Sequence, residues 1–500
     1  MLLRHSVAYL FARGVPGIIN FASLAIVTRI VDPGEYGTYA LVFSAVTVLN
    51  AVLFEWLRLG MLRFLPKNTI QRDLLLSTVL LWYLCITALV AIIVVGLIAT
   101  GGYGKHSIAI TLLGGLLLVS YAWHEINLEL ARSELAPWRY GLLSLGRQCL
   151  FLIVGGSLAY LGLGGEGLVA GLVAGCVLPS LVSTTRHWRE CSLRGASASI
   201  GWRLVKYGLP LTASVALTYV LSMSDRILIG WMIGTEAAGM YAVGYDLPRQ
   251  TTGMLMMVVT LAAYPITVRA LEQSGEAAAR AQLRKNIVLL MMIGMPATAG
   301  MAILSDEIAS LVIGEEFRET AATIMPWIAV GALLQGTKVY YLDHSFQLAG
   351  KTVPQMWVAL VAASISIIGN IILLPQYGVI AAAYTTVVAY LFAVILSYVL
   401  GRRVFPVPIP ARELMLISVA TVGMIMFLVG LKAYQGAYPL VLKIVGGGAV
   451  YGGTIVVLNL NNIRTRLLSR LVAVQAYERG EKAGSGELRH GTDEGQRSNP

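Results

Sequence analysis

Two pairs of charged side chains lie inside stretches of the sequence that are otherwise apolar. Asp225-Arg226 and Asp246-x-x-Arg249 belong to the region 202–264, and each half of that region is long enough to span a bilayer, since about 20 apolar residues cross a hydrocarbon core of roughly 30 Å. Ionisable groups at that depth are costly, so they usually face a watery cavity or a partner and mark a transport path. The pattern predicts a polytopic transporter with a charged interior.

Five cations lie within predicted spans: Arg13, Arg147, Arg226, Arg249 and Lys338. Each costs on the order of 2.5–3.5 kcal/mol at a helix centre, and a phosphate would offset that cost because guanidinium presents a planar fork of donors to its oxygens. We expect at least two of the five to line a substrate-binding cavity. The alternative is local pairing, with Asp225 serving Arg226 through a neighbouring helix and Asp246 serving Arg249 at i, i+3.

Acidic and histidine side chains in the spans are candidates for coupling transport to an ion. A buried carboxylate can take up a proton and release it when water reaches it. Glu125 and Glu129 share a helix face at i, i+4, but Glu129 lies near the predicted inner edge, where we expect it to be solvated, and Arg58 is expected at the same boundary. The coupling candidates are Glu55, Glu125, Asp225, Asp246, Asp343 and His344.

The overall composition excludes an ordinary soluble globule. Of the 500 residues, 57% are hydrophobic and 13% charged, against about 25% charged in soluble domains. The excess of 37 Lys and Arg over 26 Asp and Glu is typical of the cytoplasmic loops of a membrane protein, so no nucleic-acid partner is expected.

No motif for catalysis, a metal or a cofactor is found in the sequence. The four cysteines form no C-x-x-C pair, which argues against a disulfide frame or a zinc site. A G-x-G-x-x-G string at 162–167 lies in a short loop between apolar helices, without the preceding strand that a dinucleotide site requires. We therefore expect a transporter without catalytic residues, metal or cofactor.

Fourteen apolar runs bounded by charges, Gly or Pro predict an all-α membrane protein with about fourteen transmembrane helices. They lie near 6–31, 36–60, 74–100, 107–131, 138–161, 166–187, 202–234, 236–264, 285–313, 320–348, 352–374, 377–401, 411–432 and 437–460. With Met1 inside, the inner connections hold sixteen Lys and Arg and the outer ones four. This asymmetry predicts cytoplasmic termini.

An internal repeat predicts how the helices are grouped. When the sequence is aligned with itself at a shift of 202 residues, Gly37-Thr-Tyr39-Ala40 matches Gly239-Met-Tyr241-Ala242. At a shift of about 211 residues, Gly167-Leu-Val-Ala170 matches Gly378-Val-Ile-Ala381. Two parallel six-helix lobes are thus expected. The predicted parts are an N-terminal lobe at 1–187, a cytoplasmic linker at 188–201, a C-terminal lobe at 202–401, two appended helices at 402–462 and a disordered cytoplasmic tail at 463–500.

Four stretches of the sequence stand out as motifs. They are LFARGVPGIINFASLAIVTRIVDPGEYGTYALVFSAV, Ser224-Asp225-Arg226-Ile-Leu-Ile-Gly230 followed by Gly239-x-Tyr241, Gln347-Leu-Ala-Gly-Lys351-Thr352, and Leu374-Pro375-x-Tyr377-Gly378-x-Ile380-Ala-Ala-Ala383. These stretches resemble segments of the bacterial polysaccharide-biosynthesis flippases, the oligosaccharide flippase branch of the multidrug/oligosaccharidyl-lipid/polysaccharide exporter superfamily. These motifs are degenerate and identify the branch, not the cargo.

The resemblance implies two lobes in a V that opens alternately to each side of the bacterial inner membrane. It implies an undecaprenyl-diphosphate-linked oligosaccharide as cargo for exopolysaccharide or lipopolysaccharide synthesis, membrane lipid around the protein, and a polymerase and a chain-length regulator as partners. One alternative is a multidrug cation antiporter of the same superfamily, which would need a cavity dominated by carboxylates. Another, a membrane polymerase or ligase, would need a large periplasmic loop.

Overall fold

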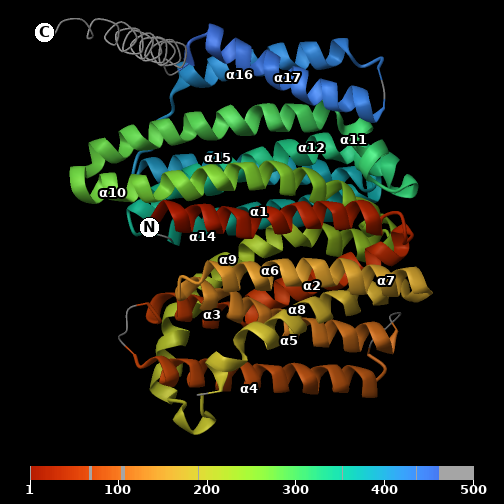
Figure 1. Cartoon of the computed structure of the whole chain (residues 1–500), viewed down its shortest axis with the longest axis vertical. Coiled ribbons are helices and arrows are strands. Elements are labelled where there is room, and N and C mark those ends of the chain that lie inside the picture. The colour runs from red at the N-terminus through yellow and green to blue at the C-terminus, as the bar shows by residue number, and fades with distance from the viewer. Residues whose placement is uncertain are drawn as a thin grey trace, which may run out of the picture. The chain divides into compact units, whose positions relative to one another are not determined.

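The structure is a computed structural model that describes residues 2–66, 70–102, 107–189, 191–351, 353–434 and 436–460, without the side chains of 2–14 and 184–187. Every regular element within these ranges is a helix (Figure 1). Contacts divide the chain into two compact units, residues 1–409 and 410–500. The predicted tail at 463–500 lies outside the described residues.

The first unit holds the elements α1 to α15. These are α1 (Leu2–Val27), α2 (Pro33–Leu53), α3 (Glu55–Phe64), α4 (Arg72–Ala99), α5 (Ile108–Ser133), α6 (Pro137–Leu150), η1 (Phe151–Gly155), α7 (Gly156–Leu158), η2 (Ala159–Leu163), α8 (Gly164–Trp188), η3 (Leu193–Gly195), α9 (Ala198–Met232), α10 (Thr235–Ile303), α11 (Ser305–Val312), η4 (Glu315–Phe317), α12 (Arg318–Thr337), η5 (Lys338–Leu342), α13 (His344–Leu348), α14 (Val353–Tyr377) and α15 (Ile380–Arg402). The second unit is the helix pair α16 (Ala411–Gly430) and α17 (Ala437–Val457), which pack against each other.

The predicted all-α polytopic fold is confirmed. Ten helical runs in the described residues are long and apolar enough to cross a membrane. Two of them, Pro137–Ser183 and Thr235–Ile303, have 47 and 69 residues, which suffices for two crossings each at 1.5 Å per residue. Each of the fourteen predicted spans falls on helix. The predicted inner connection at 265–284 is helical as well, and α10 departs from helical geometry only at Gly275, where φ is 79°.

Local sequence explains where several of these helices begin. Asp32 is the N-cap of α2 and accepts a hydrogen bond from the backbone N–H of Glu35 at 2.8 Å, with Pro33 as the first helical residue. Ser107 caps α5 in the same way, accepting from the N–H of Ile110 at 3.0 Å. Both caps satisfy backbone donors that a helix leaves unpaired at its start.

Glu134 ties α4 to the connection between α5 and α6. Its carboxylate accepts from Arg72 at 2.8 Å and from Arg139 at 2.5 Å. Partial burial acts to raise the pKa of Glu134, but the hydrogen bonds and charges of the two guanidinium groups outweigh it and lower the pKa. The connection therefore carries a carboxylate held in its ionised form.

The first turns of α2 and α10 approach each other at two glycines. A Cβ on Gly37 would overlap the carbonyl oxygen of Thr235, and a Cβ on Gly239 would overlap that of Pro33 and lie 2.7 Å from the N of Gly37. Small residues permit such close contact between membrane helices. Gly37 and Gly239 are the two positions that the 202-residue repeat aligns, so equivalent parts of the two halves touch here.

A second contact joins the same two halves near the end of α1. Arg29 donates to the backbone carbonyl groups of Leu311 and Val312 at the end of α11, at 2.7 and 2.8 Å. The backbone N–H of Gly314 donates to the hydroxyl of Thr28 at 3.0 Å. A guanidinium at a helix C-terminus satisfies free carbonyl groups and complements the helix dipole. Both contacts lie in or next to predicted outer connections and hold the two halves together at this end, which we call the sealed end.

Candidate functional site

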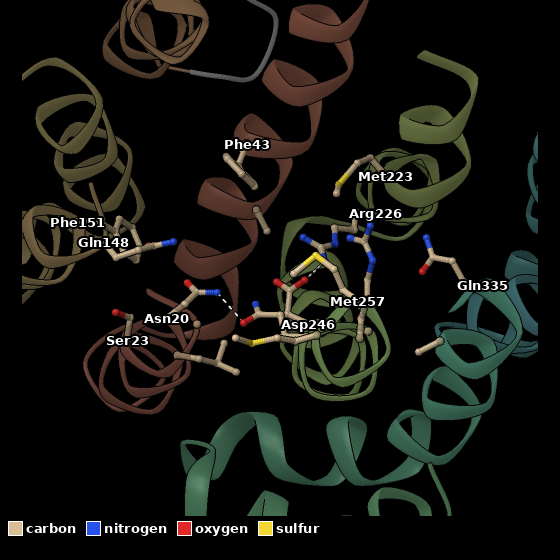
Figure 2. A pocket seen from close by; sticks show the side chains of 18 of the residues that line it. Asn20, Ser23, Phe43, Gln148, Phe151, Met223, Arg226, Asp246, Met257 and Gln335 are labelled. Atoms are coloured by element: carbon tan, nitrogen blue, oxygen red, sulfur yellow. Dashed lines mark hydrogen bonds and ion pairs between the residues drawn. The ribbon is translucent and has the colours of Figure 1, made fainter. Parts of the chain in front are cut away.

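A cavity of about 580 Å³ lies between helices from both halves of the first unit. Its walls come from α1, α2, α6, η1, α8, α9, α10, α12 and η5, and Figure 2 shows labelled side chains from several of them facing one space. Asn20 of α1 donates to the amide oxygen of Gln250 of α10 at 2.7 Å, which links two of the walls. The cavity is therefore shared by the two predicted lobes.

Three of the five predicted cations line this cavity: Arg147 of α6, Arg226 of α9 and Arg249 of α10. The Arg226 guanidinium forms an ion pair with Asp246 of α10 (Figure 2). It also lies 5.1 Å from the ring centroid of Tyr245, and the Arg249 guanidinium lies 5.6 Å from the same centroid. A tyrosine face attracts such cations, so one ring positions two arginines.

The ion pairs differ from those of the local-pairing alternative considered for the sequence. Asp246 binds Arg226 across two helices and forms no ion pair with Arg249. Among the described residues, no carboxylate lies within 4.0 Å of the Arg249 guanidinium. Arg147 lies 3.9 Å from Glu125. Against three guanidinium groups the described lining of this cavity contains one carboxylate, which leaves a net formal charge of +2.

The two other predicted cavity cations are not placed in this lining. Lys338 is 6% exposed, and its ammonium lies 2.7 Å from the Asp343 carboxylate, whereas the next residues, Val339 and Tyr340, line the cavity. Gln355 and Ser397 also donate to Asp343, at 3.2 and 3.3 Å. An acid five residues along the chain thus compensates Lys338 locally. The side chain of Arg13 lies outside the described part.

Asp343 and His344, both ion-coupling candidates, lie away from the cavity lining. Asp343 is held by Lys338, Gln355 and Ser397 as above. The His344 ring is buried against Tyr264, with ring centroids 4.4 Å apart. Neither side chain lines a described cavity, so both remain candidates without a visible path to water.

Asp225 is surrounded by neutral oxygen and amide groups from three other helices, and it does not pair with Arg226. It is 1% exposed. Four side chains donate to its carboxylate: Tyr241 at 3.0 Å, Ser366 at 2.9 Å, Asn370 at 2.7 Å and Thr386 at 2.7 Å. Burial disfavours the charged form of this group, and the four hydrogen bonds favour it. The result is a buried carboxyl group whose hydrogen-bond partners are all neutral.

These four partners cannot be predicted from the positions of the charged residues. Ser366 and Asn370 are spaced at i, i+4 on the apolar helix α14, and Thr386 lies on α15. A polar pair at helical spacing inside an apolar run is a usable signal. Gln148, Gln250 and Gln335, which line the central cavity, were missed for the same reason.

A second cavity of about 360 Å³ adjoins the first, because Arg147 and Met257 line both. Its wall holds a network centred on Arg58, which lies 2.8 Å from Glu55, 3.1 Å from Glu125 and 4.0 Å from Glu129. Glu129 is only 5% exposed, so the expectation that it is simply solvated is wrong. Ion pairs with Arg58 and Arg132 make its burial tolerable.

Long apolar helices around a polar, cationic cavity define a polytopic membrane transporter. The sequence matches the family described as "Polysaccharide biosynthesis protein" over residues 26–322. The chain belongs to this polysaccharide biosynthesis protein family, as the resemblance in the sequence predicted.

The chain is also similar in sequence to one relative and in fold to two solved structures. The chain is 22% identical over 390 residues, 78% of this chain and 81% of the relative, to the probable low-salt glycan biosynthesis flippase Agl15 of Haloferax volcanii. The fold of the present chain is similar to that of the lipid II flippase MurJ in an inward closed conformation. The TM-score is 0.74 and the identity 12%, and the match covers 91% of this chain and 100% of that chain. An inward-facing multidrug resistance MATE transporter matches with a TM-score of 0.63, 14% identity and coverage of 80% and 97%.

Proposed function

We propose that this protein moves an undecaprenyl-diphosphate-linked oligosaccharide across the bacterial inner membrane, for exopolysaccharide or lipopolysaccharide synthesis. The observation that carries the proposal is the cavity with a net charge of +2 between the two halves of a polysaccharide biosynthesis family member. A diphosphate carries the complementary charge, and Arg147, Arg226 and Arg249 offer the donors that bind its oxygens. The glycan flippase relative supports this cargo class.

The mechanism in this proposal is alternating access by two lobes, residues 1–187 and 202–401, with both termini in the cytoplasm. The sealed end at Gly37 and Gly239 would face the periplasm, and the cavity would receive its cargo from the cytoplasmic side. A polymerase and a chain-length regulator would then use the delivered unit. The repeat and the excess of Lys and Arg in the predicted inner connections support this arrangement.

The alternative, a multidrug cation antiporter, shares the fold, so the fold does not decide between the two. A cationic cargo needs an excess of carboxylates in the cavity. The described lining has one carboxylate, that of Asp246, and this carboxylate already forms an ion pair with Arg226. The charge of the cavity therefore favours an anionic cargo.

The direct test is transport by the purified protein in liposomes. A fluorescent undecaprenyl-diphosphate saccharide placed in both leaflets is expected to become accessible to a membrane-impermeant quencher faster than in protein-free liposomes. In cells, deletion of the gene is expected to abolish a surface or secreted polysaccharide and to leave its lipid-linked unit in the inner leaflet. Equal rates with and without protein would overturn the proposal.

We propose Asp225 as the coupling group for an ion, because a buried carboxyl group can take up a proton, and the three hydroxyl groups around it offer oxygen atoms to a small cation. Replacing Asp225 by Asn keeps the shape and removes the charge. In the wild type, an imposed gradient of the coupling ion, Na⁺ or H⁺, is expected to accelerate transport. In the Asp225→Asn variant, we expect the same gradient to have no effect on the transport rate. The measurement is the flipping rate with and without each gradient. An Asp225→Asn protein that responds like the wild type would rule Asp225 out.

A further inference from the structure

We propose that the second cavity is a binding subsite for the sugar units of the cargo, next to the diphosphate in the central cavity. This inference rests on the proposed function and assigns it a second site. Because Arg147 and Met257 line both cavities, a single ligand can extend from one into the other. A saccharide attached to a diphosphate has this extended form.

The charges around the second cavity are closer to balance than those of the first. Its described lining contains three guanidinium groups, Arg58, Arg132 and the shared Arg147, and two carboxylates, Glu125 and Glu129. The Glu55 carboxylate, 2.8 Å from Arg58, adds a third acid to the network. Such a wall attracts a phosphate less than the first cavity does. It offers charged donors and acceptors side by side, and a sugar hydroxyl both donates and accepts. A neutral ligand rich in hydroxyl groups fits this surface.

Buried polar groups without a partner also point to a ligand here. His124 is 0% exposed and lines the cavity. Its Nδ1 lies 3.4 Å from the hydroxyl of Ser180, whereas its Nε2 has no hydrogen-bond partner among the described residues. The Nε atom of Arg147 is likewise buried and has no hydrogen-bond partner among the described residues. Buried polar atoms are nearly always hydrogen-bonded, so a hydroxyl-bearing ligand would complete this site.

The network argues against a coupling cation in the same place, although Glu55 and Glu125 were candidates for that role. Arg58 lies within 4.0 Å of Glu55, Glu125 and Glu129, and Arg132 lies 3.7 Å from Glu129. A cation that approached these carboxylates would meet the guanidinium charges. Tyr140 and Ser144 add two further hydroxyl groups to the wall. The arrangement thus favours a neutral, hydroxyl-rich ligand.

The test compares lipids with and without sugar on the detergent-purified full-length protein. The probes are undecaprenyl diphosphate and the same lipid bearing one glucose, galactose or N-acetylglucosamine, with Kd measured by tryptophan fluorescence. We expect the wild type to bind at least one sugar-bearing lipid about fivefold or more tightly than the sugar-free lipid. Glu125→Gln should remove this difference and leave the Kd for undecaprenyl diphosphate within about twofold of wild type.

Two further variants separate a sugar site from a structural role. Tyr140→Phe keeps the ring and removes a wall hydroxyl, so it should also reduce the preference for sugar. Glu134→Gln changes a carboxylate that lines neither cavity, and it should keep the wild-type preference. Thermal unfolding checks that each variant is folded.

Three results would overturn the subsite: no preference for any sugar-bearing lipid in the wild type, an unchanged preference in both Glu125→Gln and Tyr140→Phe, or equal weakening of all four lipids by Glu125→Gln. Failure of the wild type to bind even undecaprenyl diphosphate would instead remove the proposed function and the subsite with it.

Discussion

Replacing Arg249 by Gln is expected to reduce transport of the lipid-linked saccharide about tenfold or more while the protein remains folded. Among the described residues its guanidinium has no carboxylate within 4.0 Å, so the change leaves no buried acid uncompensated. What is lost is a charged hydrogen bond to the cargo, worth about 1.5–3 kcal/mol. The measurement is the initial flipping rate in liposomes, together with the thermal unfolding temperature.

Arg226 behaves differently because it has a partner. Arg226→Gln leaves the Asp246 carboxylate without its ion pair. Breaking a fully buried pair costs about 3–5 kcal/mol, and the cost here is smaller because the Asp246 side chain is 24% exposed. We expect Arg226→Gln to lower both stability and transport, and the double variant Arg226→Gln with Asp246→Asn to recover stability but not transport.

The control is Arg403→Gln, an exposed guanidinium just after the end of α15, which should leave both quantities unchanged. If Arg249→Gln and the double variant both flip the cargo at the wild-type rate, the cavity cations do not bind the cargo.

Replacing Gly239 by Leu is expected to prevent the sealed end from closing and to trap the transporter open toward the outside. Its first side-chain carbon would overlap the Pro33 carbonyl oxygen. Overpacking of this kind costs about 1–3 kcal/mol, and such a cost falls only on the conformation in which α2 and α10 touch. It would shift the balance between two conformations by about 5- to 150-fold. Transport should fall accordingly.

The readout is a cysteine at Gln335, a cavity position (Figure 2), in a protein whose four native cysteines are replaced by Ser. A membrane-impermeant thiol reagent added outside is expected to label it faster in Gly239→Leu than in the parent. Gly300→Leu is a matched control on the same helix, because a Cβ at Gly300 meets nothing within 4 Å. Equal outside labelling of parent and Gly239→Leu would contradict the role of this contact.

The helical, membrane-spanning character could be predicted from the sequence because it depends on local properties. The length and hydropathy of each apolar run determine whether it can cross a bilayer, and residues elsewhere in the chain change neither quantity. The same logic located charged residues within the spans. It also brought out the Gly37 and Gly239 match, although not that these two glycines touch.

The interhelical partners of the charged groups could not be predicted, because they depend on how each helix is rotated against its neighbours. Asp246 could reach Arg249 on its own helix, yet it pairs with Arg226 of α9. Asp225, next to Arg226 in sequence, points away from it into a ring of hydroxyl and amide groups. Adjacent residues on a helix face about 100° apart, so packing sends them to different surroundings.

The sequence alone thus determined a polytopic helical transporter with cations in its membrane-spanning helices. Only the tertiary structure decided that Arg147, Arg226 and Arg249 line one cavity while Lys338 is neutralised by Asp343. The physical reason is that hydrophobic burial in lipid is set residue by residue along each span, whereas a charge finds its partner through contacts between helices far apart in the chain.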